Sequence, residues 1–149
     1  MSLYHLAMAR YLTTIESSLS PAEAFAYMAD FANAREWDPS VASATRASDT
    51  VGLGSTFDLV VRFGRRDLPM TYEITAYDEP RLVTLESRKP TFVSRDTITV
   101  SSSESGSTVN YDALLEFSGV AKLFDPIMQL LFNRTGDKAA AGMRASLNT

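Results

Sequence analysis

Hydrophobic and polar residues alternate with a period of two through much of the chain, and this pattern predicts β-strands. The first strand is expected at residues 8–17, which are rich in β-branched and aromatic side chains. Later strands, separated by turns that carry glycine, proline or aspartate, are expected at residues 41–48, 57–63, 70–75, 82–88, 92–101 and 109–117. Most of them have one apolar and one polar face, which is typical of an antiparallel sheet with one face in water.

A helical signal follows the first strand. Ser20 suits an N-cap, Pro21 suits the first helical position, and Glu23 completes a capping box. A helix is therefore expected over residues 21–29. A second, short helical piece is expected over residues 31–36, because the Trp-Asp-Pro sequence that follows disfavours further helix.

A long C-terminal helix is predicted by apolar residues spaced i, i+3, i+4 and i+7 across residues 120–132. Asp125 is expected to cap this helix and Pro126 to begin it. The apolar pattern thins out in its second half. There, Gly136 and Gly142 are expected to weaken the helix by about 1 kcal/mol each relative to alanine.

The order of elements is strand, two helices, six strands and a long helix, which fits one domain over residues 1–149. A sheet of six or seven antiparallel strands must cover its apolar face, and only the C-terminal helix is long enough to do so. We therefore expect an α+β fold in which a curved sheet grips that helix. Strong curling leaves a space between them, and such spaces are usual sites for small apolar ligands.

The composition excludes several classes of function. The chain has no cysteine and one histidine, His5, so it lacks the residues for thiol catalysis, disulfides, a Ser-His-Asp triad or a multi-histidine metal site. No cofactor is expected. A formal net charge of −4 does not draw a chain to nucleic acid or to an anionic membrane surface. Without a membrane-spanning run or a secretory signal, a cytoplasmic protein is expected.

Polar side chains on the apolar faces of the strands are the candidates for chemistry. Tyr72 and Tyr111 either direct their hydroxyls into the cavity or pack in the core with those hydroxyls bonded to the backbone. Asp96 shares the inward parity of Ile98. It is either a buried carboxyl suited to acid–base work, or a residue at the rim of the sheet paired with an arginine such as Arg95.

Two further features have alternative interpretations. Trp37, the only tryptophan, is either a wall of the cavity or a core anchor beside Pro39. The hairpin tip with Arg62, Arg65 and Arg66 either holds an acidic ligand group or partner, or is a solvated turn.

Residues expected to line the cavity come from the inward faces of the strands, from the short helical piece and from the C-terminal helix. They are Trp37, Phe57, Leu59, Val61, Tyr72, Ile74, Ser87, Asp96, Tyr111, Leu115, Leu123, Ile127 and Met128.

The order of elements, together with seven short segments, resembles the START-like (helix-grip, Bet v-like or SRPBCC) superfamily. The chain is most similar to its bacterial polyketide cyclase/dehydrase family. The segments are residues 20–31 (SPAEAFAYMADF), 37–41 (WDPSV), 51–57 (VGLGSTF), 77–83 (YDEPRLV), 95–100 (RDTITV), 111–113 (YDA) and 117–119 (FSG). The resemblance spans nearly the whole chain and implies a cavity between the sheet and the C-terminal helix. It implies no fixed catalytic set.

The expected function is the binding of a small hydrophobic or amphipathic metabolite, lipid-like or polyketide-like, in this cavity. The alternative is a cyclase or dehydratase that uses Asp96, Tyr72 and Tyr111 as general acids and bases. A third hypothesis is a partner-binding module that uses the outer face of the sheet, which carries Asp58, Arg62, Glu73, Thr75 and Glu116. A homodimer is compatible with each hypothesis.

Overall fold

A computed structural model describes residues 7–117 and 126–148. Seven strands form one antiparallel sheet in the order β1-β7-β6-β5-β4-β3-β2. The strands are β1 (Ala7–Ser17), β2 (Val41–Arg46), β3 (Thr56–Phe63), β4 (Arg66–Asp78), β5 (Leu82–Arg88), β6 (Phe92–Ser103) and β7 (Gly106–Phe117). All seven expected strands are confirmed, with small shifts of their ends.

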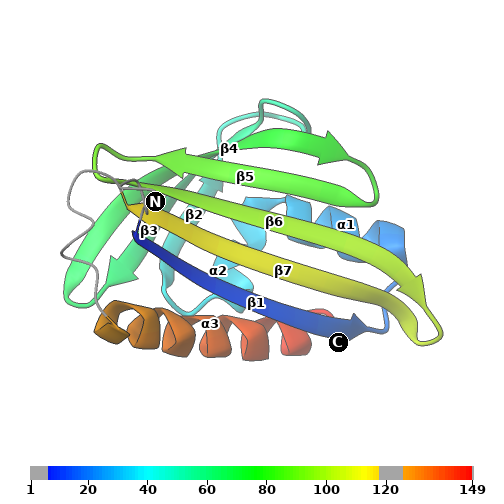
Figure 1. The fold of residues 1–149 in the computed structure, drawn as a ribbon. Coiled ribbons are helices and arrows are strands. Elements are labelled where there is room, and N and C mark those ends of the chain that lie inside the picture. The colour runs from blue at the N-terminus through cyan, green and yellow to red at the C-terminus, as the bar shows by residue number, and fades with distance from the viewer. Residues whose placement is uncertain (1–6, 118–125, 149) are drawn as a thin grey trace, which may run out of the picture.

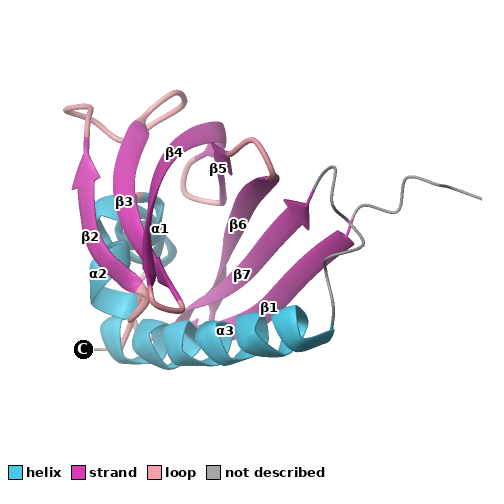
Figure 2. Cartoon of the chain, turned by 90° about the vertical axis from the view of Figure 1, so that its left-hand side faces the viewer, coloured by secondary structure: helices cyan, strands magenta, loops and turns pink. Residues whose placement is uncertain are grey.

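The helices are α1 (Pro21–Ala29), the 3₁₀ turn η1 (Phe31–Asn33), α2 (Ala34–Trp37) and α3 (Pro126–Ser146). The sheet curls strongly, α3 runs along the side of β1, and the short helices lie on the concave side of the sheet (Figure 1). Figure 2, viewed from the left-hand side of Figure 1, shows the sheet curving over α3 as a half-barrel. The expected α+β fold, with a curved sheet around a C-terminal helix, is confirmed.

The predicted capping box sets the start of α1. The Ser20 side chain accepts a hydrogen bond from the Glu23 backbone N–H at 3.2 Å, and the Glu23 carboxylate accepts one from the Ser20 N–H at 3.2 Å. These bonds satisfy two backbone donors that a helix start leaves free. Phe25 and Met28, three residues apart on one face, are fully buried and dock α1 on the sheet.

Helix α3 is attached to the edge strand β1 by side chains that bond its backbone. The Gln129 side chain accepts from the Arg10 N–H at 3.2 Å and donates to the Arg10 carbonyl at 3.1 Å. At the other end, the Asn148 amide donates to the Glu16 carbonyl at 3.0 Å. An open sheet edge is thereby covered, which removes a site for pairing with other chains.

Helix α3 continues through both glycines to Ser146, although the apolar pattern weakens there. A Cβ on Gly142 would lie 2.0 Å from the carbonyl oxygen of Trp37, and a Cβ on Gly136 would lie 2.5 Å from the Tyr11 ring. The glycines therefore allow α3 to approach α2 and β1 closely. The lower helix propensity expected from the sequence is offset by this packing, with Met143 and Leu147 fully buried.

The expected start of the C-terminal helix can be followed only in part. Asp125 and the apolar residues 120–124, which include Leu123, lie outside the described residues. Helix α3 is described from Pro126 onward, so the expected first helical residue stays a prediction.

Candidate functional site

A cavity of about 490 Å³ lies between the concave face of the sheet and helix α3. Side chains of β1, β2, β3, β4, β6 and β7 form one wall, and side chains of η1, α2 and α3 form the other. Apolar side chains provide most of the lining, so the cavity favours an apolar occupant. It exists because the short helices fill only part of the concave face.

Seven of the expected lining residues line this cavity. They are Trp37, Leu59, Val61, Tyr72, Asp96, Tyr111 and Leu115. Strand parity predicts six of them, and the family resemblance implies the seventh, Trp37.

Three other expected lining residues, Phe57, Ile74 and Ser87, are buried but do not line the cavity. The parity assigned to them is correct, because they point to the concave side. At Phe57, the 3₁₀ turn η1 fills the space. The Phe31 ring contacts Phe57 with ring centroids 6.3 Å apart. Inward parity selects a face of the sheet and does not tell which part of that face stays open.

Leu123 lies outside the described residues, and the side chains of Ile127 and Met128 do so as well. Helix α3 contributes Leu131, Phe132 and Met143 to the lining instead. The sequence reasoning missed Asp38, a loop residue without a periodic pattern, and Tyr11, which shares the inward parity of Ala9 and Ile15.

Two hydrogen-bonded polar pairs lie in the wall of the cavity. The Tyr111 hydroxyl donates to Asp96 Oδ2 at 2.9 Å, and the hydroxyls of Tyr72 and Ser94 lie 2.8 Å apart. All four residues are buried. Both tyrosine hydroxyls are therefore bonded to side chains, not to backbone carbonyls.

Asp96 is 7% exposed, and the hypothesis that it pairs with an arginine at the rim is wrong. Its neighbour Arg95 points to the opposite face and forms ion pairs with Glu86 and Glu116. Among the described residues, the Tyr111 hydroxyl is the only hydrogen-bond partner of the Asp96 carboxyl. The carboxyl therefore faces a largely apolar cavity, and no cation of residues 7–117 or 126–148 forms an ion pair with it.

Burial raises the pKa of Asp96 to about 7, partly opposed by the hydrogen bond from Tyr111. The negative charges of Asp38 and Asp112 raise this pKa further. Burial also raises the pKa of Asp38, although bonds from the Ser40 N–H and hydroxyl, at 2.9 and 2.7 Å, oppose the shift. At neutral pH, Asp96 thus exists as both acid and carboxylate.

Burial raises the pKa of the Tyr72 and Tyr111 hydroxyls, and the charge of Asp96 adds to both shifts. Both hydroxyls are therefore neutral at physiological pH, and each keeps its one O–H donor, which Tyr111 gives to Asp96. Of these three residues, Asp96 can give or take a proton near neutral pH, and the two tyrosines cannot.

Trp37 serves as both cavity wall and core anchor. Its side chain is 2% exposed, and its ring meets those of Phe31 and Tyr111 edge-on, with centroids 6.0 and 5.4 Å apart. No acceptor among the described residues reaches its Nε1. Trp37 therefore fits both interpretations, because it is buried in the core and also lines the cavity.

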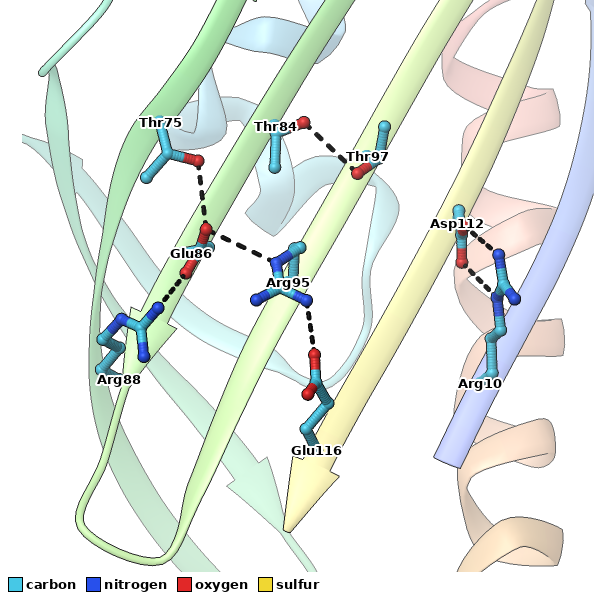
Figure 3. A network of polar contacts seen from close by, with 9 residues as sticks. All are labelled: Arg10, Thr75, Thr84, Glu86, Arg88, Arg95, Thr97, Asp112 and Glu116. Atoms are coloured by element: carbon cyan, nitrogen blue, oxygen red, sulfur yellow. Dashed lines mark hydrogen bonds and ion pairs between the residues drawn. The ribbon is translucent and has the colours of Figure 1, made fainter. Parts of the chain in front are cut away.

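The outer face of the sheet is covered by charged groups that pair with one another (Figure 3). Glu86 lies 3.1 Å from Arg88 and 3.4 Å from Arg95, which also pairs with Glu116. Arg10 forms two hydrogen bonds with Asp112, at 2.7 and 3.0 Å. Paired charges dominate this face, although Met8 and Leu12 on the same side of β1 are 53% and 62% exposed. The paired charges weaken the partner-module hypothesis, because Asp, Glu and Lys are depleted at the centres of protein interfaces.

Residues 7–117 and 126–148 contain no group of three or more histidine, cysteine, aspartate or glutamate residues that could hold a metal ion. Within the same residues, no helix is long and apolar enough to cross a membrane.

The family model for polyketide cyclase / dehydrase and lipid transport proteins matches residues 8–148. The chain belongs to this family. The resemblance expected from the sequence is thereby confirmed, and the family and fold fit a domain that binds hydrophobic ligands. A search of curated proteins by sequence finds no match.

Solved structures of this fold are similar over almost the whole chain. A START superfamily protein from Mycobacterium smegmatis superposes with a TM-score of 0.70 at 12% identity, covering 94% of this chain and 96% of that one. The major latex-like protein 151 of Panax ginseng gives 0.69 at 13% identity, with 95% and 98% covered. Ara h 8.0201 gives 0.67 at 13% identity, with 94% and 97% covered. At these identities the likeness concerns the fold.

Proposed function

We propose that this polyketide cyclase/dehydrase-like domain binds a small hydrophobic or amphipathic metabolite, lipid-like or polyketide-like, in the cavity between the sheet and α3. The main support for this proposal is the cavity of about 490 Å³, which has a largely apolar lining and few polar groups. That combination is typical of small-molecule sites, in which apolar walls supply affinity and a few polar groups set orientation.

The polar groups of the cavity would orient the ligand. The Asp96 carboxyl and the Tyr72–Ser94 hydroxyl pair lie in the same wall, on β4 and β6. A ligand hydroxyl can donate to the carboxylate form of Asp96, and a ligand carbonyl can accept from its acid form. A ligand carboxylate is disfavoured at this point because Asp38 and Asp96 already repel one another.

Leu115→Trp tests the proposal because Leu115 lines the cavity on β7. The larger side chain should fill the cavity and lower the uptake of Nile red, a neutral apolar dye, at least several-fold. Dye fluorescence during titration measures this uptake, and urea unfolding checks that the variant is folded.

Leu114→Trp is the matched control, because Leu114 is the adjacent residue of β7 and does not line the cavity. Equal dye uptake by Leu115→Trp and wild type would contradict the cavity as the binding site. In a separate experiment, denaturing extraction of the native protein, followed by identification of any molecule released, would name the ligand class.

A second candidate function, cyclase or dehydratase chemistry, is favoured by one observation: Asp96 has a pKa of about 7 and lines the cavity. A pKa near the working pH suits a group that must both take and give a proton. Asp96→Asn should then lower the turnover of a β-hydroxyketone at least about tenfold. Unchanged turnover would remove Asp96 from the chemistry.

A further inference from the structure

Among the described residues, the exposed part of the cavity lining lies at one end of the half-barrel, which we call the opening. The exposed residues of this lining lie on the β3–β4 hairpin and on α3, and include Arg62, Phe63, Leu131 and Arg134. The β3–β4 turn, the β5–β6 turn and the first half of α3 surround this end (Figure 2). Phe92, which follows the β5–β6 turn, also belongs to the lining.

Cationic residues gather around this opening in a chain whose formal net charge is −4. We call them the basic rim, and they are Arg62, Arg65, Arg66, Arg88, Lys89 and Arg134. Two acidic groups offset part of the charge, because Arg62 lies 3.4 Å from Asp67 and Arg88 lies 3.1 Å from Glu86.

The opposite end of the strands has the reverse charge. Its turns, between β4 and β5 and between β6 and β7, carry Asp78, Glu79 and Glu104, with Arg81 as their only cation. The charge is therefore distributed unevenly: cations are concentrated at one end of the strands and acidic residues at the other, although the net charge is acidic. Cations concentrated at the opening are expected to attract anions there, even though the net charge of the chain is negative.

Large apolar side chains are exposed within the basic rim. Phe63 is 46% exposed, Leu130 is 51% exposed and Leu131 is 47% exposed. Phe63 follows Arg62 on β3, and Leu130 lies one helical turn before Arg134 on α3. Cations beside exposed apolar side chains are the combination that binds anionic lipid at a membrane surface.

We propose that the basic rim and its exposed apolar residues dock this protein, cavity opening first, on a bilayer that contains anionic phospholipids. The cations would contact the headgroups, while Phe63, Leu130 and Leu131 would enter the interface between headgroups and acyl chains. Docking in this orientation places the cavity against the source of an apolar ligand.

Vesicle co-sedimentation tests the proposal. Wild-type protein should sediment with vesicles of phosphatidylcholine and phosphatidylglycerol, and far less with phosphatidylcholine alone. Added salt should release it, because salt screens the attraction between exposed charges. The double variant Arg65→Glu/Arg66→Glu should bind at least about tenfold more weakly, since each cation near an anionic membrane contributes to binding. Leu130→Ser should weaken binding without changing its salt dependence.

These three substituted residues do not line the cavity, so Nile red uptake in the absence of vesicles should stay at the wild-type level in each variant. The matched control is Arg81→Glu/Arg144→Glu, which reverses two exposed cations away from the opening. It should leave vesicle binding unchanged.

Wild-type protein that stays in the supernatant with phosphatidylglycerol vesicles would overturn the docking proposal, and so would an equal loss of binding in the control. Loss of dye uptake in Leu115→Trp tests the ligand cavity separately. The two proposals can therefore fail independently.

Discussion

The Asp96 carboxyl shows how one residue can link the cavity to the stability of the fold. It is buried beside an apolar space with a single hydrogen-bond donor, the Tyr111 hydroxyl, among the described residues. Its pKa is about 7 in the folded protein, compared with about 3.9 in an unfolded chain. At a pH between these two pKa values, the folded state binds more protons than the unfolded state. The contribution of Asp96 to stability therefore falls as the pH rises from about 4 to about 7.

Asp96→Asn should remove this pH dependence, because asparagine is neutral throughout. Relative to wild type, the free energy of unfolding of the variant should increase between pH 4 and pH 7, by an amount on the order of 4 kcal/mol, and then level off. Urea unfolding of both proteins across this range measures the difference. Tyr111→Phe removes the hydrogen bond that lowers the Asp96 pKa. When Asp96→Asn is measured in the Tyr111→Phe background, the difference in unfolding free energy should therefore level off at a higher pH. A difference that stays constant with pH would mean that Asp96 titrates normally.

At the scale of elements, the position of α3 depends on residues that its helical pattern does not favour. Gly142 meets the backbone of Trp37, and Gly136 meets the Tyr11 ring. Helix propensity alone ranks alanine about 1 kcal/mol above glycine at such positions. The backbone of α2 cannot move aside as easily as a tyrosine ring, so the two glycines differ in importance.

Gly142→Ala should lower the free energy of unfolding by about 2 kcal/mol, because the new Cβ would lie 2.0 Å from the Trp37 carbonyl oxygen and force α3 away from α2. Gly136→Ala should have a smaller effect, because only the Tyr11 side chain must turn. Chemical denaturation of both variants gives the comparison. A stabilised Gly142→Ala variant would show that propensity outweighs close packing here.

Much of the fold could be predicted because its signals are local. The capping box around Ser20 fixes α1, and strand parity places Tyr72, Asp96 and Tyr111 on the concave face. What is not local could not be predicted. Whether Phe57 borders open space depends on Phe31, which packs over it from a different element. The contribution of Asp38 likewise depends on where its loop meets the sheet, for which no periodic pattern exists.

For the whole molecule, the distribution of charge matters more than its sum. A net charge of −4 suggests repulsion from anionic surfaces. Because strands in an antiparallel sheet run back and forth, alternate turns gather at the same end, although they lie far apart in sequence. The turns with Arg65 and Lys89 meet at the cavity opening, and the turns with Glu79 and Glu104 meet at the opposite end. This topology converts scattered charges into a polarised molecule.

The pairing of β1 with β7 sets the order in which a growing chain can complete its sheet. Ala7 pairs with Phe117, and α3, which bonds the free edge of β1, follows later still. On the ribosome, the first strand must therefore wait for almost the whole chain before either of its edges is satisfied. Such long-range pairing slows folding. During that interval β1 is an unpaired strand with alternating apolar residues, and this is when the nascent protein is most exposed to aggregation.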